Sequence, residues 1–411
     1  MKISLIEFSV QNFKTFKDKA TFSMSARKND NHTFESNGEN LLKTSFIYGP
    51  NASGKTSLLE AILNFRNTVL NSANNDSKLP YNNFKAYRND IDEPVFFELA
   101  FTLDAETYQY SFSFLKDYIV SENLSRITPS GSEVKYITRT MQDIKLGDSF
   151  KSLEILQDKT RKDSLFLSQA AQFNDTFALN VLKAFQDMKV ISGITYNTYK
   201  NFTINKFKND AEYRKNILGY LKMADFCIID GRTDEVDAPH LDIKDDIEGL
   251  SITKTMQKAN KLILEHPVYN TDGKDVGKFE LSFDEESEGT KKFLSVLGPI
   301  IDVLAGGKIL LIDEFDNSLH PLLTRFIVDL FESKNTNKQN AQLVATTHDT
   351  SLLAYKDEFI KDQFWFAEKD NLGASKLFSL GEFDIRNDTE FADKYLEGRF
   401  GALPFINSLK K

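Results

Sequence analysis

Residues 44–57, TSFIYGPNASGKTS, constrain the fold more than any other stretch of the chain. The apolar, β-prone run at 46–48 leads into Gly49, and Gly54, Lys55 and Thr56 complete the spacing G-x-x-x-x-G-K-[ST]. Glycine permits positive φ angles, so the backbone N–H groups of such a loop can turn toward an anion. Residues 55–63 have helical spacing, and the positive end of that helix would point at the anion. The sequence therefore predicts a nucleoside triphosphate site between a strand and a helix.

Lys55 would reach the outer phosphates, and the Thr56 hydroxyl would ligate Mg²⁺. The alternative is a glycine-rich turn with a structural role only, but the strand before the loop and the helix after it favour the nucleotide site. We expect the whole loop to contact the nucleotide: Gly49, Pro50, Asn51, Ala52, Ser53, Gly54, Lys55, Thr56 and Ser57.

The bulk properties exclude several classes of protein. A chain of 411 residues exceeds one typical core, so we expect two domains or lobes. The net charge of −9 gives no global basic field for nucleic acid, although a local basic patch is left open. The single cysteine, Cys227, allows no disulfide within the chain, and its apolar neighbours predict a buried thiol. The apolar run 293–312 is interrupted by Asp302 and Lys308, so we expect no membrane span and a soluble, cytoplasmic protein.

The layout of periodic segments predicts an α/β fold. Strands are expected at 3–10, 20–24, 94–103, 108–114 and 134–137, forming an antiparallel β-subdomain, with a polar loop at 27–40. From about residue 150 the spacing becomes helical. We expect an amino-terminal part of an ATPase head at 1–150, a mainly helical insertion at 151–268 and the carboxyl-terminal part of the head at 269–411.

Two apolar strands carry polar residues at their ends. Residues 308–312 precede Asp313 and Glu314, which could hold Mg²⁺ and act as the general base for the attacking water, respectively. A solvated acidic turn is the alternative. Residues 342–346 precede His348, which could sense the terminal phosphate. A lone histidine after a strand is usually structural, but its position after Asp313 and Glu314 favours a functional role.

Two interpretations of Ser287-Glu288-Gly289 stay open. Ser287 can cap the helix that follows, with Glu288 favouring its first turn. Alternatively, the hydroxyl, the backbone N–H groups and the helix dipole bind a phosphate, which need not belong to a nucleotide of the same chain.

These elements, in this order, resemble the ABC-type head ATPases of the SMC-like and RecF-like branch. Residues 49–56 match the Walker A loop, Asp313 and Glu314 match Walker B and its catalytic glutamate, and His348 matches the switch histidine. Ser287-Glu288-Gly289 matches a degenerate signature turn, and Ser318-Leu319-His320-Pro321 lies where the D-loop sits. The turn at 12–16 nominates Lys14 as a basic residue near the phosphates. The Q-loop glutamine stays open among Gln109, Gln142 and Gln169.

The resemblance extends to the AAA-15/AAA-21-type ATPases of bacterial defence loci, which include RloA/AbiL-like abortive-infection proteins with relatives in OLD, PARIS and Septu systems. It is carried by residues 5–14, 165–169, 313–321 and 395–404. The family implies ATP and Mg²⁺ as cofactors and a head-to-tail dimer in which Ser287 and Gly289 of one copy touch the γ-phosphate held by Lys55 of the other. It also implies a separately encoded effector, such as a TOPRIM-like or HNH nuclease, and a role as sensor or regulator in anti-phage defence.

Two alternative functions stay open beside the regulated ATPase. Residues 196–215 interleave basic and aromatic side chains, a pattern that suits nucleic-acid contact as well as an ordinary solvated helix face. A RecF-like repair ATPase that binds DNA directly is therefore one alternative, and a nucleotide-gated scaffold with negligible turnover is the other.

Overall fold

The computed structural model describes residues 2–75, 77–86, 92–191, 196–224, 226–246, 249–317, 319–355, 358–384 and 391–403, with the backbone alone at 196–198, 239–246 and 249–254. The chain forms two compact units. The first comprises residues 1–192, 303–317 and 327–411, and the second comprises residues 193–302 and 318–326.

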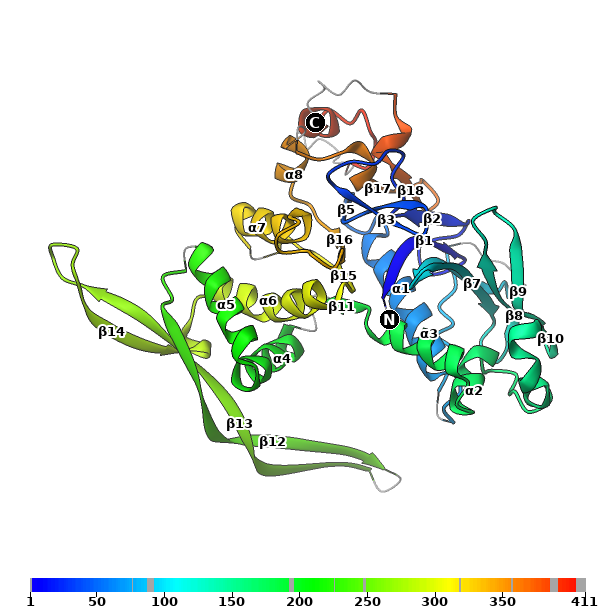
Figure 1. The fold of residues 1–411 in the computed structure, drawn as a ribbon, viewed down its shortest axis with the longest axis horizontal. Helices are drawn as coiled ribbons and strands as arrows, with labels where there is room; N and C mark the ends of the chain where they lie inside the picture. Colours follow the sequence, from blue (N-terminus) through cyan, green and yellow to red (C-terminus); the bar gives the residue numbers. More distant parts are fainter. Residues whose placement is uncertain are drawn as a thin grey trace, which may run out of the picture. The chain divides into compact units, whose positions relative to one another are not determined.

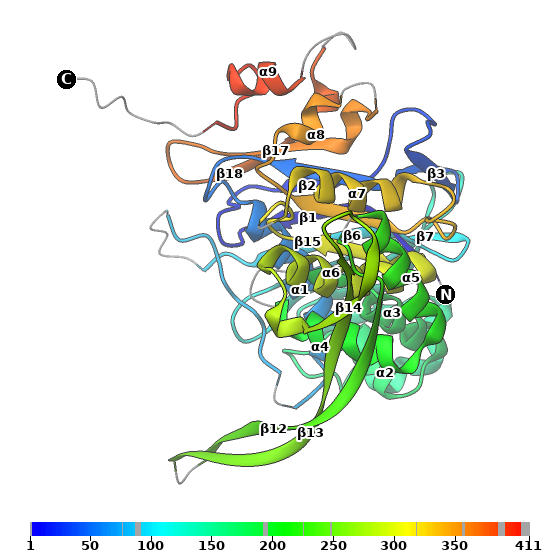
Figure 2. The same ribbon diagram turned by 90° about the vertical axis from the view of Figure 1, so that its left-hand side faces the viewer.

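A six-stranded sheet is the centre of the first unit. Its order is β11 (Lys189–Ile191), β15 (Ile309–Ile312), β16 (Gln342–Thr346), β5 (Thr44–Tyr48), β17 (Phe364–Lys369) and β18 (Ser375–Ser379). The first five strands are parallel and β18 is antiparallel. All residues of β5, β15 and β16 are buried, which explains the apolar runs at residues 46–48, 309–312 and 343–345 within them. Helix α1 (Lys55–Asn71) lies on one face of this sheet and the short α8 (Ser351–Ala354) on the other (Figures 1 and 2).

A seven-stranded antiparallel sheet forms the second layer of this unit. Its order is β10 (Asp143–Leu146), β9 (Glu133–Thr140), β8 (Ile119–Ile127), β7 (Glu106–Phe114), β6 (Val95–Leu103), β1 (Ile3–Gln11) and β2 (Ala20–Ser23). Phe65 of α1 packs in the core next to this sheet, with its ring 5.2 Å from that of Phe112 and 5.9 Å from that of Phe8. The α/β fold class, a mixed sheet with the phosphate-loop core and an antiparallel β-sheet, is thus confirmed.

The expectation of a polar loop at 27–40 is wrong. β3 (Thr33–Ser36) and β4 (Glu39–Leu42) form a hairpin there. Its two-residue turn is Asn37-Gly38, and both residues have positive φ (53° and 84°). Asn-Gly is the preferred pair for such a turn, so this hairpin had a readable signal.

A buried ion pair joins the antiparallel sheet to helix α2 (Phe166–Gln172). The carboxylate of Glu122 accepts hydrogen bonds from the backbone N–H groups of Phe166 (2.7 Å) and Leu167 (3.0 Å). Arg139 lies 3.6 Å from this carboxylate, and neither side chain is exposed to solvent. The 3₁₀ segment Asp148–Leu156 precedes α2, and helix α3 (Thr176–Gln186) follows α2.

The second unit contains α4 (Tyr196–Asn209), α5 (Ala211–Met223), most of α6 (Glu288–Gly306) and the first half of α7 (Pro321–Glu332). It also contains a ribbon of long antiparallel strands, β12 (Asp230–Asp246), β13 (Gly249–Tyr269) and β14 (Asp275–Ser282), visible in green in Figure 1. The segment 151–268, expected to be mainly helical, is therefore strand over most of its last forty residues. The described residues of β14 are exposed almost throughout, and in β13 buried residues alternate only at Leu262, Leu264 and His266. Most of the ribbon therefore lacks the one-sided apolar alternation that identifies a half-buried strand.

Cys227 is exposed, so the prediction of a buried thiol is wrong. The residue lies in the connection between α5 and β12 with φ of 51°, and its neighbour Ile228 fills the core instead. In the part of the chain that the structure describes, none of the helices combines the length and apolar character needed to span a bilayer. The last helix, α9 (Phe391–Leu396), precedes the end of the described residues.

Candidate functional site

The loop after β5 has a backbone that only certain residues can adopt. Gly49, Ala52 and Gly54 take positive φ angles of 147°, 63° and 113°. A Cβ atom on Gly49 would stand 2.3 Å from the carbonyl oxygen of Ala367, and one on Gly54 would stand 2.5 Å from Oγ of Ser375. Both contacts are far below van der Waals distance, so the two glycines are required by space as well as by backbone angle.

Helix α1 begins directly at the end of this loop. Its first intrahelical hydrogen bond runs from the Leu58 N–H to the Gly54 carbonyl at 3.0 Å. The N–H groups of Lys55, Thr56 and Ser57 therefore precede the helical hydrogen-bonding pattern and can serve an anion, which the helix dipole also favours. Thr56 is exposed and Ser57 is half-buried, so this end of the helix is open to a ligand.

The Lys55 side chain curls back over its own loop. Its ammonium group donates hydrogen bonds to the carbonyl oxygens of Gly49 (2.7 Å) and Pro50 (3.0 Å). Burial lowers the pKa of Lys55 to about 8, and the nearby carboxylates of Asp313, Asp316 and Glu314 oppose this fall. These three acids influence the charge of the lysine although they lie more than 250 residues away in the sequence.

The acids are brought there by the parallel sheet. β16 lies between β15 and β5, with Ile312 opposite Ala345 and Ala345 opposite Phe46. Because parallel strands end at the same edge, Asp313 and Glu314 follow β15 at the edge where the phosphate loop follows β5. Asp313 is half-buried and Glu314 is exposed.

Thr346, the last residue of β16, bridges the two acids. Its hydroxyl donates to Oδ1 of Asp313 at 2.6 Å and accepts from the backbone N–H of Glu314 at 2.9 Å. Glu314 has a left-handed backbone with φ of 50°, and Oε2 of its carboxylate accepts a hydrogen bond from Asn317 at 3.2 Å.

His348 follows β16 at the same edge. Its backbone N–H donates to Oδ1 of Asp316 at 3.2 Å. Partial burial of the ring, and secondarily the charge of Lys55, lower the pKa of His348 below the ordinary 6.5, while Asp316, Glu314 and Asp313 act in the opposite direction. The lowered pKa favours the neutral form of the ring at pH 7 and above.

Lys14 lies in the turn after β1 with a left-handed backbone, φ 49°. Its ammonium forms an ion pair with the carboxylate of Glu60, which follows Thr56 by one turn of α1. The structure thus brings Lys14 to the first turns of the helix that begins at the loop.

The signature turn belongs to the second unit. There, Ser287 precedes α6, and its hydroxyl accepts a hydrogen bond from the Thr290 N–H at 3.2 Å, as a helix cap does. Gly289 lies in the first turn of this helix. Ser318 of the expected D-loop lies outside the described residues. Of the candidate Q-loop residues, Gln109 bonds to Glu98 and Gln142 bonds to Arg139, both within the antiparallel sheet.

Two residues of the edge were missed by the sequence analysis. Thr346 and Asp316 carry no signature of their own, because a threonine at the end of an apolar strand and an acid in a turn are common. The stretch Ala345-Thr346-Thr347-His348 did contain polar residues before the histidine, which was the only available signal.

Two cavities open on the first unit. One, of about 540 Å³, adjoins the phosphate loop and His348, and aromatic and apolar residues of the carboxyl-terminal segment form its other wall. It is lined by Gly49, Pro50, Asn51, His348, Thr350, Glu368, Lys369, Tyr395, Leu396 and Leu403.

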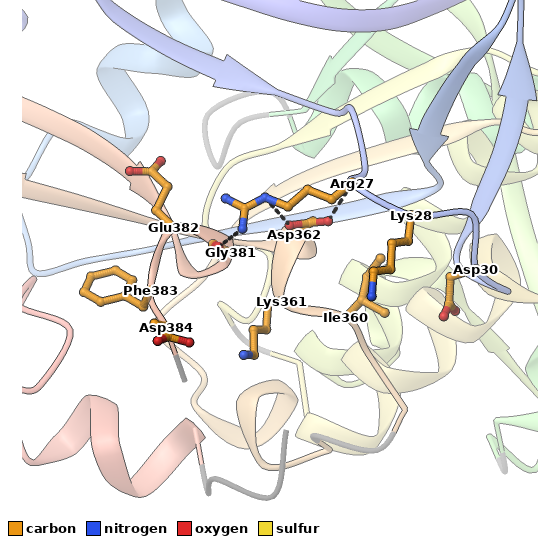
Figure 3. A pocket seen from close by; sticks show the side chains of 10 residues that line it. All are labelled: Arg27, Lys28, Asp30, Ile360, Lys361, Asp362, Gly381, Glu382, Phe383 and Asp384. Carbon is orange, nitrogen blue, oxygen red and sulfur yellow. Dashed lines mark hydrogen bonds and ion pairs between the residues drawn. The ribbon is translucent and has the colours of Figure 1, made fainter. Parts of the chain in front are cut away.

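The other cavity, of about 510 Å³, is shown in Figure 3. Its residues are Arg27, Lys28, Asp30, Ile360, Lys361, Asp362, Gly381, Glu382, Phe383 and Asp384. The backbone N–H of Arg27 bonds to Asp362 at 3.0 Å, and its guanidinium bonds to the Gly381 carbonyl. Three cations and four carboxylates share this cavity, so it is not an anion site.

Comparison with known proteins agrees with the chemistry of the edge. The family model AAA_21, described as "AAA domain, putative AbiEii toxin, Type IV TA system", matches residues 45–354, more than half of the chain. A search of curated proteins finds no match. Among solved structures, the chain is similar to "Structure of the recombination mediator protein RecF-ATPrS in RecFOR pathway", with a TM-score of 0.35 and 13% identity over 92% of this chain and 98% of that chain. At this TM-score, the similarity adds nothing to the assignment of function.

Proposed function

Because the chain belongs to the AAA_21 family of AAA domains, we propose that it binds and hydrolyses Mg·ATP and that its nucleotide state regulates a separately encoded effector. One observation carries this proposal. Lys55, Asp313, Glu314 and His348 come from three different strand ends and lie at one edge of a parallel sheet. This combination provides a cation, a metal ligand, a base and a neutral imidazole for a phosphoryl-transfer reaction.

The phosphates would lie on the open N–H groups at the start of α1, with the Lys55 ammonium released from the carbonyls of Gly49 and Pro50 to meet them. The Thr56 hydroxyl and the Asp313 carboxylate are hard oxygen ligands of the kind that Mg²⁺ prefers, with phosphate oxygens and waters completing the shell. Bound Mg²⁺ would neutralise charge that develops on the phosphates. Lys14 would add a further positive charge at the same end of the helix.

Glu314 would take a proton from the attacking water. Its exposed carboxylate suits contact with solvent at the nucleotide, and its left-handed backbone directs it away from the strand axis. His348, neutral at pH 7, can donate one hydrogen bond and accept another, which suits a residue that orients the water and senses the terminal phosphate.

By resemblance, the active assembly is a head-to-tail dimer in the cytoplasm. Ser287 and Gly289 of one copy would complete the phosphate site of the other. The effector would be a nuclease of TOPRIM-like or HNH type, and the system would act in abortive-infection defence against phage.

The test is phosphate release and mass by light scattering, with and without Mg·ATP. We expect Lys55→Ala to lose nucleotide binding, and Glu314→Gln to keep binding, stop release and accumulate an ATP-dependent dimer. Glu154→Gln and Lys159→Ala change exposed residues of another region and serve as matched controls. Unchanged hydrolysis in Glu314→Gln would reject the assigned base, whereas tight ATP binding without any release by the wild type would favour the nucleotide-gated scaffold.

A further inference from the structure

Thr346 differs from the other residues at the site edge because it has no expected contact with the nucleotide or the metal. Its hydroxyl nevertheless forms hydrogen bonds with both Asp313 and Glu314. Its side chain is completely buried. Its hydroxyl has one proton and therefore donates one strong hydrogen bond, here to Oδ1 of Asp313 at 2.6 Å. A lone pair on the same oxygen accepts the Glu314 N–H at 2.9 Å.

We propose that Thr346 is a positioning residue: it fixes the Asp313 carboxylate for the metal and holds the left-handed backbone that directs the Glu314 carboxylate at the water. This inference rests on the proposed Mg·ATP hydrolysis. One hydroxyl thereby couples the metal ligand to the general base.

Backbone strain makes the second bond important. A non-glycine residue at φ of about 50° is strained, and such a backbone persists only where its surroundings hold it. The Glu314 N–H donates to the Thr346 hydroxyl, and the following N–H, of Phe315, donates to the Thr346 carbonyl at 2.9 Å. Both the side chain and the backbone of Thr346 therefore hold this turn, and only the side-chain part can be removed by substitution.

The adjacent threonine performs a different task. The Thr347 hydroxyl accepts the N–H of Asp349 at 3.0 Å, which shapes the turn after His348. The bridge between the acids is thus a property of position 346 and not of hydroxyl groups at this strand end in general.

The experiment compares Thr346→Val, which keeps the shape and removes both bonds, with Thr346→Ser, which keeps the hydroxyl. Thr68→Val is the matched control, because Thr68 is also buried and its hydroxyl donates to the Asn64 carbonyl of its own helix. For each variant we would measure ATP affinity in EDTA, the Mg²⁺ concentration for half-maximal activity, kcat and the thermal midpoint.

Thr346→Val should bind ATP in EDTA within about threefold of the wild type, because the phosphate loop is untouched. Its Mg²⁺ concentration for half-maximal activity should rise at least about tenfold, and its kcat should fall at least about tenfold. Losses of this size are seen when groups that orient metal ligands are removed. Thr346→Ser should recover most of both losses, and Thr68→Val should show neither.

A Thr346→Val protein with wild-type Mg²⁺ demand and kcat would overturn the inference. Equal losses in Thr346→Ser and Thr346→Val would also overturn it, because packing and not the hydroxyl would then be responsible. If the wild type hydrolyses no ATP, the proposed function fails by itself. The positioning of Asp313 is then judged by the Mg²⁺-induced gain in ATP affinity, which Thr346→Val should reduce.

Discussion

The depressed pKa of Lys55 predicts that ATP affinity falls as the pH rises from 7 to 9. In the unliganded protein the lysine titrates near pH 8, because its burial disfavours the charged form. Bound phosphates would hold the proton on the ammonium. Binding above pH 8 must therefore take up a proton, and the apparent dissociation constant should rise about tenfold for each further pH unit.

The magnitude follows from the titration. Lys55 is about nine-tenths protonated at pH 7 and about one-tenth protonated at pH 9, so affinity should weaken by about tenfold between them. The folding stability of the unliganded protein should change in the opposite direction to the ATP affinity and rise with pH. A folded-state pKa of about 8 against the ordinary 10.5 means that the unfolded chain binds more protons between these values, so the unliganded fold gains up to about 3 kcal/mol as the pH rises through that window.

Isothermal titration calorimetry in EDTA, at constant ionic strength and in two buffers of different ionisation enthalpy, measures both effects. ATP binding at pH 8.5 should take up about three-quarters of a proton, and at pH 7 about one-tenth. The terminal phosphate, whose second pKa is about 6, is almost fully ionised above about pH 8 and adds little slope there, so the measurement at pH 8.5 decides. Lys55→Arg keeps its charge at all these pH values and should remove the proton uptake. Constant affinity and no proton uptake in the wild type would refute either the depressed pKa or the contact with phosphate.

Three further predictions concern other parts of the first unit. Arg139→Ala leaves a buried carboxylate without its cation and should lower the free energy of unfolding by about 3–5 kcal/mol in urea denaturation, whereas Lys145→Ala, at an exposed ion pair, should cost less than about 1 kcal/mol. Gly54→Ala forces a side chain into a backbone of φ 113° and against Ser375, and should weaken ATP binding at least fivefold, while Gly219→Ala, with open space around it, should leave binding unchanged. Because the pKa of His348 is lowered in the unliganded protein, any acid limb of the kcat/KM profile that His348→Gln removes should be centred below pH 6.5; a limb above that value would contradict the assignment.

The strand–loop–helix at the phosphate site could be predicted from local sequence, and so could the apolar strands that end in Asp313 and near His348. In each case a fully buried parallel strand produces an unbroken apolar run whose end is marked by polar residues. Helix α5 (Ala211–Met223) lies in the segment whose spacing was expected to be helical, and apolar spacing is a local signal.

The bridge through Thr346 could not be predicted, since it depends on the neighbour order of strands that are 30 residues or more apart in the sequence. The two long strands β12 and β13 were missed for a different reason. Few of their described residues are buried, and buried residues alternate only near the end of β13, at Leu262, Leu264 and His266, so most of their sequence shows no regular apolar side. Cys227 was expected to be buried because its neighbours are apolar, but it has a left-handed backbone in the connection between α5 and β12 and is exposed.

The ion pairs of the second unit bear on the rival function of direct DNA binding. Lys208 donates to Glu235 at 2.7 Å and Arg214 donates to Asp230 at 2.8 Å, so both basic residues face carboxylates of the ribbon. Exposed ion pairs contribute little to stability, and a phosphate could displace one alone at little cost. The displaced carboxylates would then stand beside the DNA backbone and repel it, in a chain whose net charge is already −9. The basic and aromatic stretch is therefore better explained by contacts between α4, α5 and the ribbon than by an open groove for nucleic acid.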